Sequence, residues 1–192
     1  MFSEIETDRL LLRKLRMEDV EDLFAYTSDP EVAKYVSWNK HVEIEEAIRY
    51  INHVLDQYDE DDHTYIWAIE LKENQKMIGT IEVSSLSFRH RRCVLESDMN
   101  REYWNKGYNT EALTAVLDYC FTSLNLHKVQ AHCFKDNWAS RKVLQKVGMV
   151  NEGVMRDHIY HEGKYHDILR FSILKEDYSN NPLPFKRVLY LL

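Results

Sequence analysis

The stretch Tyr103-Trp104-Asn105-Lys106-Gly107-Tyr108-Asn109-Thr110-Glu111-Ala112 lies between a predicted strand and a predicted helix. Upstream, residues 93–99 (CVLESDM) have the pattern of a strand. Downstream, apolar residues recur at helical spacing, at Leu113, Val116, Leu117, Cys120, Phe121 and Leu124. The first turn of a helix has unpaired N–H groups and a positive dipole potential, a combination that binds phosphates. The stretch therefore predicts a phosphate-binding strand, loop and helix start with a single glycine, Gly107.

The composition is typical of one soluble domain that is large enough to bury a core. The net charge of −7 argues against non-specific nucleic-acid binding and weakly favours cationic or amine substrates. Cys93, Cys120 and Cys133 are scattered through apolar patterns, so we expect buried free thiols in a reducing cytoplasm. We expect no secretory signal and no membrane span, because no run approaches the ~18 apolar residues that a span needs.

The rest of the chain alternates helical and strand patterns without an internal repeat or linker. The predicted strands are 9–13, 65–71, 77–84, 93–99, 128–134, 150–160 and 165–174. The predicted helices begin at Met17, at about Glu43, after the turn that contains Gly107, and at Asn137, with breaks at Asp29-Pro30 and Gly148. This order predicts a single α/β (α+β) domain, with a mixed, mostly antiparallel central sheet and helices on both faces.

We expect the domain to cover residues 1–179 and a C-terminal tail to cover residues 180–192. The breaker cluster NNPLP (180–184) precedes a short apolar end. That end is expected to add an edge strand, to contact a second subunit or to be disordered. Between the second long helix and the next strand, residues 59–62 (DEDD) predict an acidic loop.

The glycine-rich alternatives for a phosphate site are missing. The chain contains neither G-x-G-x-x-G nor G-x-x-x-x-G-K-[ST], so dinucleotide-binding folds and P-loop enzymes are unsupported. A second element, Asn137-Trp138-Ala139-Ser140, begins the helix after the next strand and has an asparagine cap with a hydroxyl in the first turn. Helix capping alone is the simpler interpretation of that element.

Four stretches together resemble a known family in their order and spacing. They are residues 103–113, TDRLLLR (7–13), Asn137-x-x-Ser140 with the helix end at 147–149, and EGVMRD (152–157) with its hairpin GKYHD (163–167). The first closely resembles the acetyl-CoA-binding motif of the GNAT superfamily of N-acetyltransferases. More narrowly, the set resembles the branch that acetylates the N-termini of ribosomal proteins, from about Glu6 to Tyr178.

The resemblance implies an enzyme that moves the acetyl group of acetyl-CoA, its cosubstrate, to a primary amine by direct attack. A protein or peptide N-terminal α-amine is the acceptor that the nearest branch implies. Polyamines and aminoglycosides are acceptors of sister branches, and a non-catalytic acetyl-CoA-binding module is a further alternative. A homodimer is common in this branch. No cysteine nucleophile and no metal are implied, and the histidines near the last hairpin match no zinc signature.

The resemblance also implies roles for individual residues. Backbone groups of Met99 and Asn100 would pair with the pantetheine arm. The pyrophosphate loop would consist of Trp104, Asn105, Lys106, Gly107, Tyr108, Asn109 and Thr110. Asn137 would contact the cofactor, and Ser140 would protonate the leaving thiolate.

Several positions differ from the usual pattern of this branch. Asn105 and Asn109 stand where glycine or alanine is usual, and asparagine tolerates left-handed backbone geometry. Val94 stands where the branch often has a glutamate on the central strand. Glu96 and Asp98 share the face of Val94 by the two-residue period of a strand, and either could act as general base or hold a cationic substrate.

Aromatic residues near both ends of the domain could border the substrate. We expect the hairpin at 158–167, with Tyr160 and Tyr165 beside its turn, to line the acceptor cleft or simply to pack. Tyr35 and Trp38, between the first two helices, could border the acceptor channel, although core packing is the more frequent use of such side chains.

Overall fold

The computed structural model describes residues 2–60, 64–180 and 189–191. One sheet contains all its strands, in the order β7-β8-β6-β5-β4-β3-β2-β1-β9. The strands are β1 (Glu4–Glu6), β2 (Leu10–Arg13), β3 (Tyr65–Leu71), β4 (Lys76–Ser87), β5 (Arg92–Met99), β6 (Lys128–Phe134), β7 (Val150–His161), β8 (Lys164–Leu174) and β9 (Leu189–Leu191). Within the described ranges β5 and β6 form the one parallel pair, which confirms the predicted mixed, mostly antiparallel sheet.

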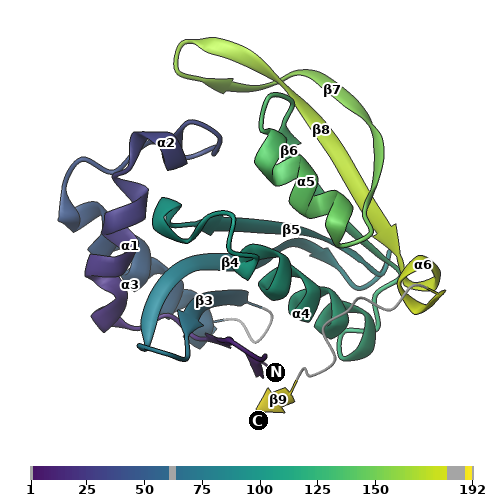
Figure 1. The fold of residues 1–192 in the computed structure, drawn as a ribbon, viewed down its shortest axis with the longest axis horizontal. Coiled ribbons are helices and arrows are strands. Elements are labelled where there is room, and N and C mark those ends of the chain that lie inside the picture. The colour runs from purple at the N-terminus through teal and green to yellow at the C-terminus, as the bar shows by residue number, and fades with distance from the viewer. Residues whose placement is uncertain (1, 61–63, 181–188, 192) are drawn as a thin grey trace.

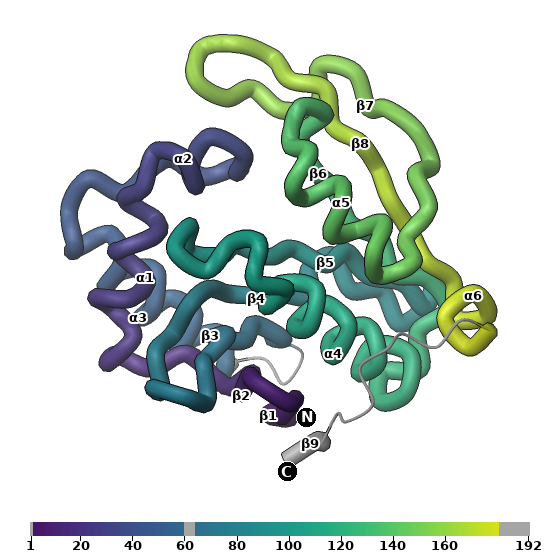
Figure 2. Tube along the Cα trace, in the orientation of Figure 1, coloured from purple at the N-terminus to yellow at the C-terminus, as the bar shows by residue number. Residues whose placement is uncertain are grey.

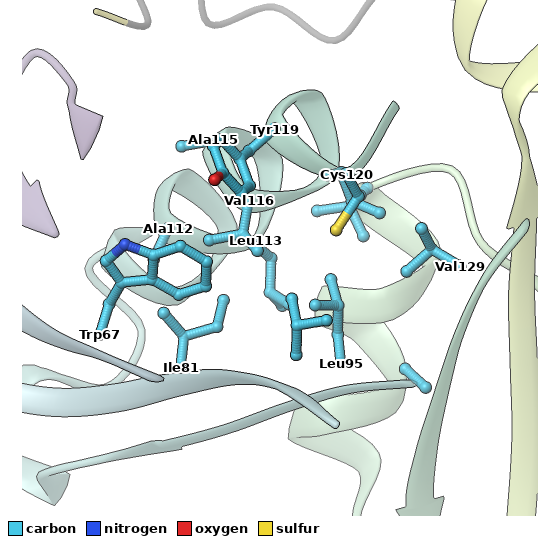
Figure 3. Close-up of a cluster of buried hydrophobic side chains, with 14 of the residues drawn as sticks. Trp67, Ile81, Leu95, Ala112, Leu113, Ala115, Val116, Tyr119, Cys120 and Val129 are labelled. Carbon is cyan, nitrogen blue, oxygen red and sulfur yellow. The ribbon is translucent and has the colours of Figure 1, made fainter. Parts of the chain in front are cut away.

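Helices cover both faces of the sheet (Figure 1). They are α1 (Val20–Thr27), α2 (Pro30–Ala33), α3 (Ile44–Glu60), α4 (Tyr108–Thr122), α5 (Trp138–Lys146) and α6 (Lys175–Asn180), with 3-10 turns at Met17–Asp19 and Arg101–Tyr103. The two-residue period of β3 explains the arrangement. Trp67 packs in one buried cluster with α4, as Figure 3 shows, and the next residue, Ala68, packs in another with α1 and α3.

The parallel pair is short, and this determines the shape of the centre of the molecule. β5 and β6 pair only from Arg92 with Lys128 to Leu95 with Ala131. Beyond that point β5 stays with β4, whereas β6 continues beside β8 as far as Phe134. The sheet therefore divides at this point, and Figure 2 shows β7 and β8 angled away from β5.

The structure corrects some predicted boundaries. Asp29-Pro30, predicted only as a break, also begins α2, because Asp29 accepts a bond from the N–H of Glu31 and proline is favoured in the first helical turn. β1 was not predicted. Helix α3 extends to Glu60, into the predicted acidic loop, whose remaining residues lie outside the described part of the chain.

For the C-terminal end, the structure shows one of the three alternatives that the sequence left open. For the cysteines, it shows the predicted buried free thiols. β9 pairs with β1 as an added edge strand, while residues 181–188 lie outside the described ranges. Cys93, Cys120 and Cys133 are free and buried, as predicted. Within the described residues, no helix has the length and apolar character needed to cross a bilayer.

Candidate functional site

The far end of β5 presents backbone groups toward the point where the sheet divides. The N–H of Asn100 donates to the carbonyl of Ile78 at 2.8 Å. Because backbone groups alternate in direction along an antiparallel pair, those of Ser97 and Met99 point away from β4. They face the side from which β6 has departed. This edge can pair with an extended ligand that carries amide groups.

Of the two backbone sites predicted for pantetheine, Met99 faces this edge and Asn100 does not. The carbonyl of Met99 accepts a bond from the indole N–H of Trp104 at 2.8 Å. The Asn100 N–H is bonded to Ile78, and its carbonyl accepts a bond from the N–H of Tyr103 at 3.0 Å. Sequence reasoning missed Ser97, which the alternation along the predicted strand could have indicated.

Helix α4 begins without a side-chain cap. Its N-cap is Gly107, with φ of 82°, a left-handed conformation that glycine adopts at little cost. The first intrahelical bond runs from the N–H of Glu111 to the carbonyl of Gly107 at 3.0 Å. The N–H groups of Tyr108, Asn109 and Thr110 therefore precede the helical ladder, where an anion binds best.

The loop before α4 contains another residue with a left-handed backbone besides Gly107. This residue is Asn105, with φ of 61°. Asparagine replaces glycine here as the sequence suggested. Lys106 places its ammonium 5.2 Å from the centre of the Tyr103 ring. The side-chain oxygen of Asn109 is buried and has no hydrogen-bond partner among the described residues. An amide oxygen does not bind phosphate, so this oxygen is not part of an anion site, whereas the backbone N–H of Asn109 is a donor in the first turn.

Helix α5 begins on the other side of the division, after β6. The side-chain oxygen of Asn137 accepts a bond from the N–H of Ser140 at 3.0 Å, so its described contact is helix capping. The hydroxyl of Ser140 lies close enough to Cys133, on the part of β6 that has left β5, to lower the pKa of its thiol slightly. Burial raises the pKa of Cys133 to about 11, so this thiol stays protonated.

Three carboxylates gather on one face of β4 and β5. Glu82 lies directly opposite Glu96, and Asp98 lies opposite Thr80 on the same face. Burial, with added repulsion from Glu96 and Asp98, raises the pKa of Glu82 to about 7. Glu96 is exposed and accepts a bond from the hydroxyl of Ser84 at 2.6 Å.

Asp98 is half-buried, as Glu82 is. Burial raises its pKa to about 6, although a bond of 3.1 Å from the indole N–H of Trp38 favours the charged form. Sequence reasoning named Glu96 and Asp98 but missed Glu82. The available signal was the place of Glu82 on the predicted strand 77–84, which the structure pairs with the strand of Glu96 and Asp98.

Tyrosines from the helices on this face contribute to the burial. The hydroxyl of Tyr26 in α1 lies 3.2 Å from that of Thr80, and Tyr50 comes from α3. Burial raises the pKa of both phenols well above 10, and the charge of Asp98 raises each further. The carboxylates thus lie beside neutral, largely buried side chains, where their charges are weakly screened.

Aromatic rings connect the N-terminal helices to the last hairpin. Tyr35, after α2, contacts Phe134 with 6.0 Å between ring centres. Phe134 in turn lies 5.2 Å from His166 and 6.1 Å from His161. Tyr160 and Tyr165, flanking the hairpin turn, are exposed and contact each other.

Comparison with known proteins agrees with this architecture. The family model for the "Acetyltransferase (GNAT) domain" matches residues 9–150. The chain is 36% identical over 175 residues to the "Uncharacterized N-acetyltransferase YoaA" of Bacillus subtilis, covering 91% of this chain and 98% of that protein. It is 26% identical over 167 residues to the spermidine N(1)-acetyltransferase of Escherichia coli, covering 87% of each.

Solved structures share the fold. A GNAT-family acetyltransferase from Bacillus anthracis superposes with a TM-score of 0.80 at 29% identity, covering 90% of this chain and 99% of that one. The ribosomal-protein-S5-alanine acetyltransferase from Vibrio fischeri superposes with a TM-score of 0.78 at 22% identity, covering 91% and 97%. The divided sheet, the uncapped start of α4 and the family match together show that this chain belongs to the GNAT family of acetyl-CoA-dependent N-acetyltransferases.

Proposed function

We propose that this chain transfers the acetyl group of acetyl-CoA to a primary amine by direct attack on the thioester. The carrying observation is the division of the sheet between β5 and β6. Strand β5 contributes a backbone edge, carboxylates and, at its end, the loop to the uncapped helix α4. The hydroxyl of Ser140 comes from the opposite side of the division, because α5 follows β6 in the chain and packs against it.

Each region has a separate task in this proposal. The edge at Ser97 and Met99 pairs with the pantetheine amides, and the first-turn N–H groups of α4 hold the pyrophosphate. Acetyl-CoA supplies the activated acetyl group. The amine nitrogen bonds to the thioester carbon, and the carbon–sulfur bond then breaks. Ser140 donates a proton to the departing thiolate and regains one from solvent.

Glu82 is the carboxylate that we assign as general base, in place of Glu96 or Asp98. It lies directly opposite Glu96 on the face that also presents Asp98, and with a pKa raised to about 7 it binds and releases protons near neutral pH. Asp98 is held by Trp38, and Glu96 by Ser84. These two carboxylates attract the ammonium form of the acceptor, and Glu82 takes the proton that the amine loses.

The acceptor proposed first is a protein or peptide N-terminal α-amine, which the resemblance to the ribosomal-protein branch supports. A polyamine is the second candidate, because three neighbouring carboxylates suit an acceptor with several positive charges. The spermidine N(1)-acetyltransferase among the relatives supports this candidate. We also propose that the protein is cytoplasmic, which the three free thiols support. We propose a homodimer as well, because the resemblance to the ribosomal-protein branch implies one.

The test combines an acceptor panel with the pH dependence of Glu82→Gln. Thiol release from acetyl-CoA is measured with N-terminal peptides, spermidine and an aminoglycoside. With the accepted amine, the kcat/KM of the wild type should fall as the pH drops below about 7, because Glu82 is then protonated. Glu82→Gln should lower kcat/KM by roughly 10²-fold and remove this step from the profile.

Glu152→Gln is the matched control, because Glu152 pairs with Lys128 on the opposite half of the sheet. It should leave the profile unchanged. A Glu82→Gln enzyme with the wild-type rate and profile would exclude Glu82 as the base. Absence of both acetyl-CoA binding and turnover in the wild type would refute the proposed function as a whole.

A further inference from the structure

The turn between β1 and β2 is bonded to the first turn of α4. It contains Thr7 and Arg9, from the stretch TDRLLLR, which has no task in the reaction proposed above. The hydroxyl of Thr7 donates to Oε1 of Glu111 at 2.7 Å, and the backbone N–H of Arg9 donates to the same oxygen at 2.9 Å. Nε of Arg9 donates to Oε2 at 2.7 Å. Segments 102 residues apart are thus joined through one carboxylate.

Glu111 has an unusual position for a carboxylate. Its side chain is only 1% exposed, and it lies in the first turn of the helix whose N–H groups are proposed to hold a pyrophosphate. A buried charge requires partners, and a carboxylate beside an anion site repels the anion unless a cation compensates it. Arg9 supplies this cation, with Nη2 2.6 Å from Oε2.

The guanidinium of Arg9 also contacts the loop itself. Nη1 donates to the carbonyl of Lys106 at 3.0 Å, and the guanidinium carbon lies 4.4 Å from the centre of the Tyr108 ring. A Cβ on Gly107 would meet Nη2 at 3.4 Å. The guanidinium therefore lies against residues 106–108. The side chain of Arg9 is 43% exposed. A guanidinium has five N–H groups, which is more than these contacts use.

We infer that Arg9 is a positioning residue for the nucleotide half of acetyl-CoA. Fixed by Glu111, it holds the Lys106 carbonyl and the left-handed Gly107 so that the first N–H groups of α4 meet the pyrophosphate. It also cancels the charge of Glu111, which would otherwise oppose phosphate binding. This inference rests on the proposed use of acetyl-CoA, but it concerns only the pyrophosphate and nucleotide part of that molecule.

The experiment compares acetyl-CoA with S-acetylpantetheine, which lacks the pyrophosphate and the nucleotide. Arg9→Gln should raise the KM for acetyl-CoA, and the Kd for CoA measured by calorimetry, by about tenfold or more. The KM for S-acetylpantetheine and kcat with either donor should change by less than about twofold. A general structural defect would instead affect both donors.

Three further variants sharpen the test. Arg9→Lys keeps the charge but loses the fork that binds Glu111 and Lys106 together, so its KM for acetyl-CoA should be intermediate. Adding Glu111→Gln to Arg9→Gln should restore part of the affinity for CoA, because the uncompensated charge is removed. Lys76→Gln, which removes an ion pair between α1 and β4, is the matched control and should change neither KM.

Two outcomes would overturn the inference: an equal rise in the KM for both donors, or no rise for either in Arg9→Gln. If Arg9→Gln does not fold, the same comparison in Arg9→Lys decides between these results. A wild-type protein that does not bind CoA would refute the proposed function and this inference with it. Normal CoA binding by the wild type and Arg9→Gln alike would refute the inference alone.

Discussion

Helices α4 and α5 begin on opposite sides of the divided sheet, and their first turns differ. Helix α4 begins at Gly107, which provides no side-chain cap, whereas α5 begins at Asn137, whose amide oxygen binds the N–H of Ser140. An uncapped turn leaves N–H groups for an anion, and a capped turn has already satisfied one of them. The difference separates two tasks: α4 is suited to hold a phosphate, and α5 is suited to hold a hydroxyl in place.

The neighbours of each turn strengthen this comparison. The first turn of α4 is fixed from outside, by Arg9 and Thr7 acting through Glu111. The first turn of α5 is fixed from within, by its own cap. Consequently, changes at Gly107 should affect the binding of CoA, changes at Ser140 should affect the chemical step, and changes at Asn137 should affect stability first.

The largest effect is expected from Gly107→Val. A β-branched residue is strained at φ of 82°, and its Cβ would meet the guanidinium of Arg9 at 3.4 Å. The variant should lose detectable CoA binding by calorimetry. Gly163→Val is the matched control, because Gly163 has φ of 80° but no atom within 4 Å of its Cβ position. Equal losses in the two variants, or wild-type affinity in Gly107→Val, would contradict the assignment of this loop.

A smaller effect, confined to the chemical step, is expected from Ser140→Ala. Removing the hydroxyl should lower kcat by roughly tenfold to a hundredfold, while the Kd for CoA changes little, because the cap at Asn137 remains. Steady-state kinetics and calorimetry together measure the two quantities. Ser179→Ala, which removes a hydroxyl bonded within α6, is the control. An unchanged kcat in Ser140→Ala would exclude the acid role.

The smallest effect is expected from Asn137→Ala. Loss of the cap should lower the free energy of unfolding by about 1 kcal/mol, which corresponds to a fall in Tm of about 2–4 °C. Asn137→Asp keeps an acceptor for the Ser140 N–H and should retain most of the stability. Denaturant and thermal unfolding measure the change. Unaltered stability with a large rise in the Kd for CoA would instead make Asn137 a direct ligand, as the family resemblance implies.

Most elements follow from local patterns in the sequence. The two-residue and 3.6-residue periods predicted β3, β5, β6 and α4 closely. One face of each element must be buried, and the positions of the apolar residues indicate that face. Short elements with few apolar residues were harder to predict from the sequence. β1 was missed because three residues carry little pattern, and the start of α2 was hidden because Asp29-Pro30 marks a helix start as readily as a break.

For the candidate site, the sequence predicted the residue types and their order along the chain, including Gly107, the Asn137-x-x-Ser140 start and the acidic strand. These are local properties, since a helix start, a left-handed glycine and an alternating strand each depend on neighbouring residues. Strand alternation could have indicated Ser97 and Glu82, but only the tertiary structure showed that β6 departs from β5 after Leu95, that Glu82 lies opposite Glu96 and that Arg9 is joined to Glu111. These juxtapositions depend on strand register and on the packing of α4 against the first strands, which bring together residues that are distant in the chain.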